Sequence, residues 1–228
     1  MPLSLSVAEL TDAARIAEIH MAAFGSNAML LAQFPTPAVR NALKKSIELK
    51  ALADIDDLKT TVLVVRDSSS ELHNNSTISG DNEQTYERRR KEQVIAFAKW
   101  SHPVRLDEDY VEPPWIWPTG TNLDILNDWA KKTEAAQSRA LGNTPCYRLT
   151  FMGTDPAYQR RGAATMMVRW GIEHSRKDGA PAYLESTLEA APFYRNLGFV
   201  DVDNISLEYQ VDGTEERSIY EEVSFLYR

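Results

Sequence analysis

The sequence predicts an α/β fold, because runs of β-favouring apolar residues alternate with amphipathic helical segments along its 228 residues. Two strand candidates, residues 60–66 and 93–100, are rich in valine and aromatic or small apolar residues. A third run, residues 147–154, ends at the turn signal Asp155-Pro156. A helix follows, whose apolar face is made by residues at helical spacing: Ala164, Met167, Val168, Gly171 and Ile172.

Composition narrows the class of protein. Hydrophobic residues make up 43% and charged residues 25%, as in ordinary globular domains. The net charge of −8 and the pI of about 5.1 lack the basic footprint of a nucleic-acid binder, and we expect no nucleic-acid partner. A single cysteine, Cys146, excludes an intrachain disulfide and a cysteine-based metal site, and four scattered histidines suggest no metal.

The location of the protein is also a prediction. The first residues lack the basic segment and apolar run of a signal peptide. No apolar segment approaches the ~20 residues that span a bilayer. We therefore expect a cytoplasmic protein without a membrane partner, either a monomer or a homodimer.

The remaining elements can be placed by local signals. A strand is expected over residues 3–10 and a helix from Thr11 to Phe24, broken at residues 25–27. Thr36-Pro37 predicts the start of a second helix that runs to about residue 53. Two closing strands are expected over residues 200–209 and 218–227, joined by a turn near Asp212-Gly213.

We expect a single domain over residues 1–228 that carries two insertions. Residues 67–92 are almost free of apolar side chains and predict a polar loop. Residues 103–145 begin with an aromatic, proline-rich segment over 111–118, which favours irregular structure. A helix is then predicted over residues 122–141.

The stretch around residues 149–164 predicts an anion-binding site. A helix that begins at Gly162 presents free backbone N–H groups and a partial positive charge. Gly162 and the small residues after it would let a phosphate approach the backbone, beside the charges of Arg160 and Arg161. The stretch lacks the Lys-Ser/Thr of a nucleotide P-loop and the G-x-G-x-x-G of a dinucleotide site.

Two motifs give this stretch a family resemblance. Gln159-x-x-Gly162-x-Ala164 resembles the Q/R-x-x-G-x-G/A acyl-CoA motif of the GNAT superfamily of N-acyltransferases. Tyr194-x-x-x-Gly198-Phe199 is similar to the Y-x-x-x-G-F that closes the core of that family. The resemblance is specific over residues 147–200. Thr187 departs from it, because many members carry asparagine at this position.

The resemblance implies both fold and chemistry. It implies a mixed, mostly antiparallel sheet with helices on both faces, in which the strands before and after the main helix splay apart to admit acetyl-CoA. It implies direct transfer of the acetyl group to a primary amine. The residues that it assigns to the cofactor are Met152, Gly153, Thr154, Gln159, Arg160, Arg161, Gly162, Ala163, Ala164, Thr165, Thr187 and Tyr194.

The same resemblance supplies the catalytic candidates. Tyr194 would protonate the departing CoA thiolate, since a phenol is a donor at neutral pH. The glutamate that some members carry on the strand before the motif is absent here. Glu185 is the nearest carboxylate in the family layout, with a structural role as the alternative. His20 and His102 are further candidates for the general base.

The acceptor is less closely defined. Phe24, Trp100 and Trp115 could line an aromatic acceptor pocket, or the aromatic residues of the second insertion could simply pack against the core. We expect a small-molecule amine as acceptor. The alternatives are a protein lysine or N-terminus, and a non-catalytic acyl-CoA-binding module.

Overall fold

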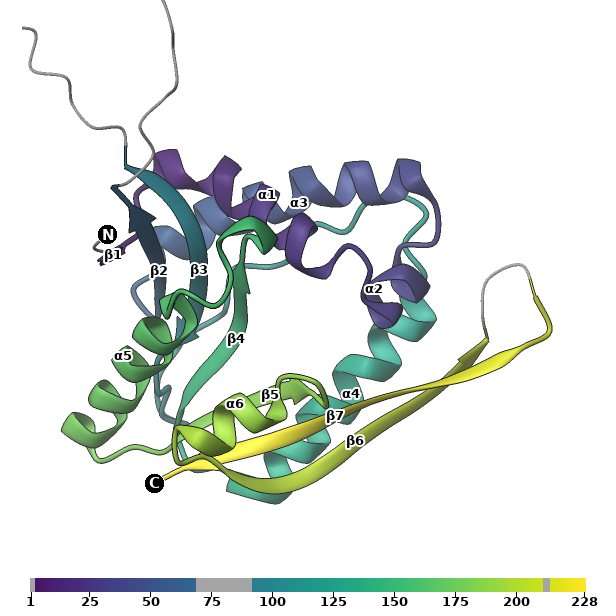
Figure 1. Cartoon of the computed structure of the whole chain (residues 1–228). Coiled ribbons are helices and arrows are strands. Elements are labelled where there is room, and N and C mark those ends of the chain that lie inside the picture. Colours follow the sequence, from purple (N-terminus) through teal and green to yellow (C-terminus); the bar gives the residue numbers. More distant parts are fainter. Residues whose placement is uncertain (1–2, 69–91, 211–213) are drawn as a thin grey trace, which may run out of the picture.

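The computed structural model describes residues 3–68, 92–210 and 214–228, and these form a seven-stranded sheet with helices on both faces. The strand order is β1-β2-β3-β4-β5-β7-β6, and every neighbouring pair is antiparallel except β4 and β5 (Figure 1). The predicted fold class is therefore confirmed. The strands are β1 (Leu3–Val7), β2 (Thr60–Asp67), β3 (Gln93–Ser101), β4 (Tyr147–Thr154), β5 (Ala182–Thr187), β6 (Val200–Gln210) and β7 (Arg217–Tyr227).

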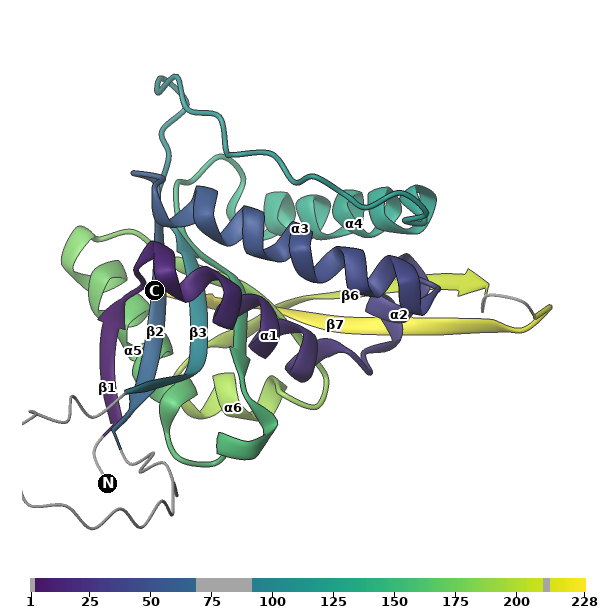
Figure 2. The same cartoon turned by 90° about the horizontal axis from the view of Figure 1, so that it is seen from above.

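The helices divide between the two faces. One face is packed against α5 and α6, and the other against α1 and α3. Figure 2 shows α3 and α4 on one side of the β6–β7 hairpin and α6 on the other. None of the described helices is both long and apolar enough to cross a bilayer. The helices are α1 (Ala13–Phe24), α2 (Ala28–Gln33), α3 (Pro37–Ile55), α4 (Leu123–Leu141), α5 (Ala163–Asp178) and α6 (Ala191–Asn196), with 3-10 turns η1 (Leu10–Asp12) and η2 (Pro156–Tyr158).

Capping residues explain where the N-terminal helices begin. Thr36 accepts the backbone N–H of Val39 at 3.3 Å, which confirms the predicted start of α3. Helix α2 is an addition to the predicted elements, since residues 25–27 signal only a break in the sequence. Asn27 ends that break and also caps α2, since its side-chain oxygen accepts the N–H groups of Met29 and Leu30.

The two predicted insertions have different outcomes. Residues 69–91, nearly all of the predicted polar loop, lie outside the described residues, as does the predicted turn at residues 212–213. In the second insertion the chain has no regular secondary structure before it enters α4, as predicted for its proline-rich part. Glu112 fixes this irregular part, because its carboxylate accepts hydrogen bonds from Nζ of Lys50 at 3.0 Å and from Nζ of Lys99 at 2.8 Å. Both lysines are buried and also pair with Asp54.

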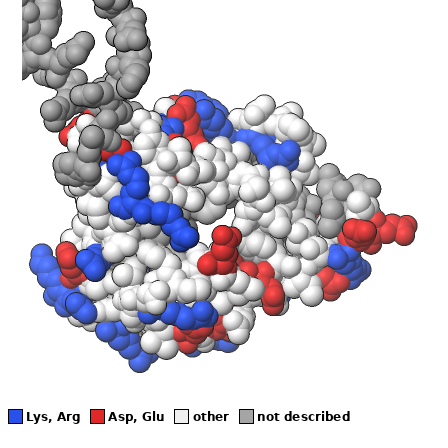
Figure 3. All heavy atoms as spheres, viewed as in Figure 1, with Lys and Arg blue, Asp and Glu red and all other residues white. Residues whose placement is uncertain are grey.

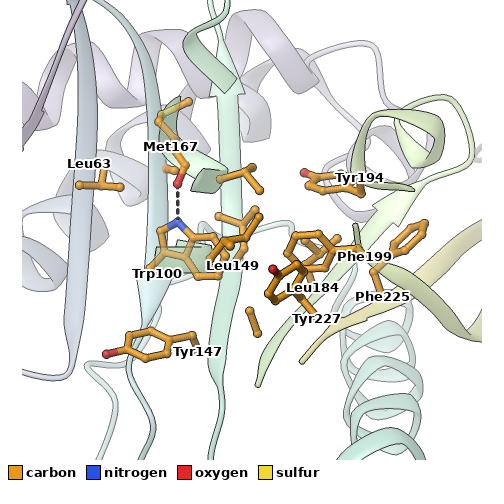
Figure 4. Packing of buried hydrophobic residues seen from close by; sticks show 14 of the residues in the cluster. Leu63, Trp100, Tyr147, Leu149, Met167, Leu184, Tyr194, Phe199, Phe225 and Tyr227 are labelled. Carbon is orange, nitrogen blue, oxygen red and sulfur yellow. Dashed lines mark hydrogen bonds between the residues drawn. The ribbon is translucent and has the colours of Figure 1, made fainter. Parts of the chain in front are cut away.

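Trp100 is at the centre of the larger core, beneath α5 (Figure 4). Its side chain is fully buried, and its indole N–H donates to the carbonyl of Met167 at 3.2 Å. Gly171 makes room for the ring, because a Cβ built there would stand 2.2 Å from a Trp100 ring atom. The prediction that Trp100 lines an acceptor pocket is therefore wrong: strand alternation directs it into the α5 face of the sheet.

Substitution Gly171→Ala tests this packing. The added Cβ must displace the Trp100 ring, so we expect the free energy of unfolding to fall by about 1–3 kcal/mol. Urea denaturation measures the change. Glu173→Ala, on the exposed side of the same helix, is the control and should change stability by less than about 0.5 kcal/mol. A gain of stability in Gly171→Ala, as helix propensity alone predicts, would contradict the packing.

Candidate active site between β4 and β5

The site is built around the divergence of β4 from β5. The two parallel strands pair only where residues 147–149 face 182–184, and then separate (Figure 4). The divergence coincides with a bulge in β4. Phe151 faces Lys99 whereas Leu149 faces Trp100, so Thr150 is the extra residue. A bulge bends its strand, and this one turns the second half of β4 away from β5.

The second half of β4 presents a free backbone edge to the gap. The N–H of Asp155 donates to the carbonyl of Ile95 at 2.9 Å, which fixes the alternation of the antiparallel ladder. Gly153 therefore directs its backbone groups to β3, where it faces Phe97. Met152 and Thr154 direct theirs into the gap. Such an edge can pair with an extended ligand that carries amide groups.

Gly153 thus has a different role from the one predicted. Its backbone was expected to contact the cofactor, but that backbone is used in pairing with β3. The absence of a side chain is what matters. A Cβ at Gly153 would stand 2.9 Å from the ring of Phe97 and 3.5 Å from that of Phe24. The glycine allows α1 to pack closely against the sheet.

The loop that follows β4 leads into the N-terminus of α5. Arg160 and Gly162 adopt positive φ angles of 63° and 93°, and Gly162 is the N-cap without a capping side chain. The N–H groups of Ala163, Ala164 and Thr165 are the first-turn donors that a helix leaves unpaired. No atom lies within 4 Å of a Cβ built on Gly162. The loop is therefore an open cradle of N–H groups at the positive end of α5.

The two arginines of the loop have separate surroundings. Arg161 pairs with the buried carboxylate of Asp67 at 2.5 Å, which raises the pKa of the guanidinium and ties the loop to β2. Arg160 and Gln159 are exposed, and Arg160 has no ion-pair partner within the described residues. Figure 3 shows basic side chains over the segment between η2 and α5. Arg160 is thus the more available charge for an anionic ligand.

Tyr194 reaches the gap from α6. Its ring is buried against Phe199 and Phe225, with centroids 6.0 and 5.8 Å away. In Figure 4 the ring extends from α6 toward β4, with its hydroxyl at the leading end. That hydroxyl has no hydrogen-bond partner among the described residues. Burial, with a smaller contribution from the charge of Glu222, raises the pKa of Tyr194, so the phenol keeps its proton at neutral pH.

Two other predicted residues on β5 already have partners. The hydroxyl oxygen of Thr187 accepts the N–H of Ala190 at 3.3 Å and begins the turn into α6. The carboxylate of Glu185 accepts a hydrogen bond from Nη2 of Arg148 at 2.9 Å. Burial raises the pKa of Glu185, whereas the arginine lowers it. The ion pair supports the structural alternative for Glu185.

The two candidate histidines lie in unlike surroundings. His20 is buried among the rings of Phe24, Phe97 and Phe151, and burial lowers its pKa to about 4. His102 follows β3 and bonds to Thr61 at 2.8 Å, at the closed end of the sheet where β4 and β5 are paired. His20 has no hydrogen-bond partner within the described residues, and His102 lies away from the gap, so neither histidine is placed as the base.

Aromatic side chains gather on the other face of the sheet, next to the second half of β4. Trp115 stacks on Trp117 with centroids 4.6 Å apart, and its edge meets Phe151 of β4 at 5.8 Å. Phe24 belongs to the same apolar cluster as both tryptophans. The structure thus brings two of the predicted acceptor residues together, Phe24 and Trp115, and separates Trp100 from them.

Sequence reasoning missed Glu222. This residue of β7 faces Thr187 at the open end of β5, and its carboxylate accepts the hydroxyl of Tyr220 at 2.7 Å. Burial raises the pKa of Glu222 to about 7. The sequence shows two adjacent glutamates, Glu221 and Glu222, and the only available signal was strand alternation. That signal could not tell which of them faces the site before the strand order was known.

Comparison with known proteins identifies the class of protein that this site belongs to. The model of the Acetyltransferase (GNAT) family matches residues 82–199, just over half of the chain. The chain belongs to the GNAT family of acetyltransferases, and the resemblance found in the sequence is confirmed.

Solved structures share the fold at low identity. The C-terminal condensation domain of Ebony, in complex with β-alanyl-dopamine, superposes with a TM-score of 0.64 at 11% identity, over 100% of this chain and 99% of that one. The mosquito protein named arylalkylamine N-acetyltransferase like 5b superposes with a TM-score of 0.60 at 14% identity, over 99% of each chain. Arabidopsis thaliana NAA60 in complex with a bisubstrate analogue superposes with a TM-score of 0.53 at 14% identity, over 99% of this chain and 98% of that one.

Substitution Gly162→Asp tests the cradle at the N-terminus of α5. A carboxylate there would repel a phosphate and compete for the free N–H groups. We expect the Kd for acetyl-CoA, measured by calorimetry, to rise about 10- to 100-fold. Gly179→Asp is the matched control, because Gly179 also has a positive φ and open space but lies at the other end of α5. Equal affinity in the two variants would contradict the cradle.

Proposed function

We propose that this protein transfers an acetyl group from acetyl-CoA to the primary amine of a small molecule. One observation carries the proposal: the gap between β4 and β5 joins a free strand edge, a helix N-terminus and a buried, protonated tyrosine. An extended ligand that carries a pyrophosphate, then amides and then a thioester would find a complementary group for each of them here.

The residues around the gap fit acetyl-CoA. The backbone groups of Met152 and Thr154 would pair with the amides of the pantetheine arm. The N–H groups from Arg160 to Thr165 would bind the pyrophosphate, and the exposed Arg160 side chain would add a full positive charge.

The chemistry follows from the two groups at the thioester. The amine nitrogen attacks the carbonyl carbon, a C–N bond forms and the C–S bond breaks. Free backbone N–H groups of the β4 edge would stabilise the charge that develops on the carbonyl oxygen. The hydroxyl of Tyr194 would give its proton to the departing sulfur, because the phenol remains protonated at neutral pH.

The aromatic cluster of Phe24, Trp115, Trp117 and Phe151 supports a small acceptor with an apolar or aromatic body. These rings lie beside the second half of β4, on the face opposite α5. An amine held against them would face the gap from the side opposite the phosphate cradle. One structural neighbour is named an arylalkylamine N-acetyltransferase, and another is a condensation domain in complex with β-alanyl-dopamine.

An acceptor screen tests the proposal. Release of CoA thiol would be measured with 2-phenylethylamine, with spermidine and with a peptide that carries a free N-terminus and a lysine. We expect the highest kcat/KM with 2-phenylethylamine. Turnover of the peptide alone would favour a protein acetyltransferase. Binding of acetyl-CoA without turnover of any amine would favour a non-catalytic module.

Substitution Tyr194→Phe tests the proton donor. It removes the hydroxyl and keeps the ring packed on Phe199 and Phe225. We expect kcat to fall about 10²-fold or more, while the Kd for acetyl-CoA stays nearly constant. Tyr209→Phe, on β6, is the control and should leave both unchanged. If Tyr194→Phe kept full kcat, Tyr194 would have no role in the chemistry.

A further inference from the structure

Glu222 lies on the opposite side of the sheet from Tyr194, near the same opening. Its neighbour on β5 is Thr187, the last residue of that strand. Phe225, three residues further along β7, points to the other face and packs against the ring of Tyr194 (Figure 4). The two side chains are close enough that the charge of Glu222 acts on the pKa of Tyr194. They therefore flank the region where the thioester would lie.

Hydrogen bonds hold the Glu222 carboxylate in place. The hydroxyl of Tyr220 donates to its Oε1 at 2.7 Å. The amide of Asn27 donates to the Tyr220 oxygen at 3.0 Å, and Asn27 is itself fixed as the N-cap of α2. The ring of Tyr220 also meets the edge of Trp129 on α4, with centroids 5.1 Å apart. The carboxylate is thus held by Tyr220, whose position is fixed in turn by the N-cap residue of α2 and by Trp129 of α4.

Glu222 differs from the fully buried carboxylates of the protein in having no cation beside it. Asp12, Asp54 and Asp67 each pair with a lysine or arginine at 2.5–2.6 Å. No ion pair joins Glu222 to any lysine, arginine or histidine of the described residues. A buried carboxylate without a cation holds its proton more tightly than an exposed one. Such a group can accept a proton near neutral pH, which a stably paired carboxylate does poorly.

The groups around Glu222 are consistent with this role. Burial raises the pKa of Glu222 most, the hydrogen bond from Tyr220 on β7 lowers it, and the negative charge of Glu185 on β5 raises it, which leaves the pKa at about 7. Across the ladder, β6 contributes the apolar side chain of Ile205. From α2 and α4 the nearest groups in this network are the amide of Asn27 and the ring of Trp129. The Arg148 guanidinium is held by Glu185.

We propose that Glu222 is the general base of the reaction, the group that takes the proton from the attacking amine. This inference rests on the proposed acetyl transfer. When the amine nitrogen forms its bond to the carbonyl carbon, the proton that it loses passes to the Glu222 carboxylate. The C–S bond breaks and the sulfur takes a proton from Tyr194. Glu222 then releases its proton to solvent, and Tyr194 regains one. Glu185 is not assigned this role because its carboxylate is already paired with the half-buried Arg148, and proton uptake would break that ion pair.

Substitution Glu222→Gln separates this role from a structural one. Glutamine keeps an oxygen that accepts the hydroxyl of Tyr220, but it cannot take up a proton. The control is Glu221→Gln, since Glu221 is the preceding residue and is exposed on the other face of β7. The kcat with saturating 2-phenylethylamine and acetyl-CoA would be measured between pH 5.5 and 9, since it reports ionisations of the substrate complex.

We expect kcat of the wild type and of Glu221→Gln to rise with pH through about 7 and then level off, because only the ionised carboxylate accepts a proton. In Glu222→Gln this inflection should disappear, and kcat at pH 8 should fall about 10²-fold while the Kd for acetyl-CoA is unchanged. If Glu222→Gln kept the wild-type kcat and an unaltered pH profile, the assignment of Glu222 would be overturned, but the proposed acetyl transfer would not. A wild-type protein that acetylates no amine would overturn the proposed function and the assignment with it.

Discussion

The divergence of β4 from β5 is the constraint on which the rest of the site depends. The bulge at Thr150 ends the pairing of the two strands after residue 149 and leaves the backbone groups of Met152 and Thr154 without a strand partner. An unpaired edge in a sheet interior is costly unless something bonds to it. The helix N-terminus of α5 and the hydroxyl of Tyr194 are placed around that same edge. The fold therefore creates a need for hydrogen bonds that an extended, amide-containing cofactor meets.

Two ionisable groups lie on either side of this opening, one that keeps its proton at neutral pH and one that can take up a proton there. Tyr194 is surrounded by aromatic rings, and burial keeps its proton bound at neutral pH. Glu222 lies on the other face with one hydroxyl donor, and burial raises its pKa to about 7. Groups with separated pKa values can act as acid and base in one reaction. In the proposed reaction, Tyr194 would approach the thioester from the side of the departing thiol and Glu222 from the side of the incoming amine.

The features that could be predicted from the sequence are those that depend only on residues close together in the chain. Thr36-Pro37, Asp155-Pro156 and Gly162 determine helix starts and turns by their own backbone preferences, and all three lie where expected. The roles of Trp100 and Glu222 were not predictable in this way, because they depend on which face of a strand meets which helix. That requires the order β5-β7-β6, which places a C-terminal strand inside the sheet. The partner of Arg161 is likewise Asp67, 94 positions away.

Everything proposed for this protein depends on the binding of acetyl-CoA in the gap between β4 and β5. Isothermal titration of the purified full-length protein with acetyl-CoA tests it most directly, with NAD and ATP as controls that share the nucleotide and pyrophosphate but lack the pantetheine arm. We expect saturable one-to-one binding of acetyl-CoA and much weaker binding of both controls. Equal affinity for ATP would show that the cradle recognises phosphate without the strand edge. Absence of acetyl-CoA binding by the folded protein would contradict the account.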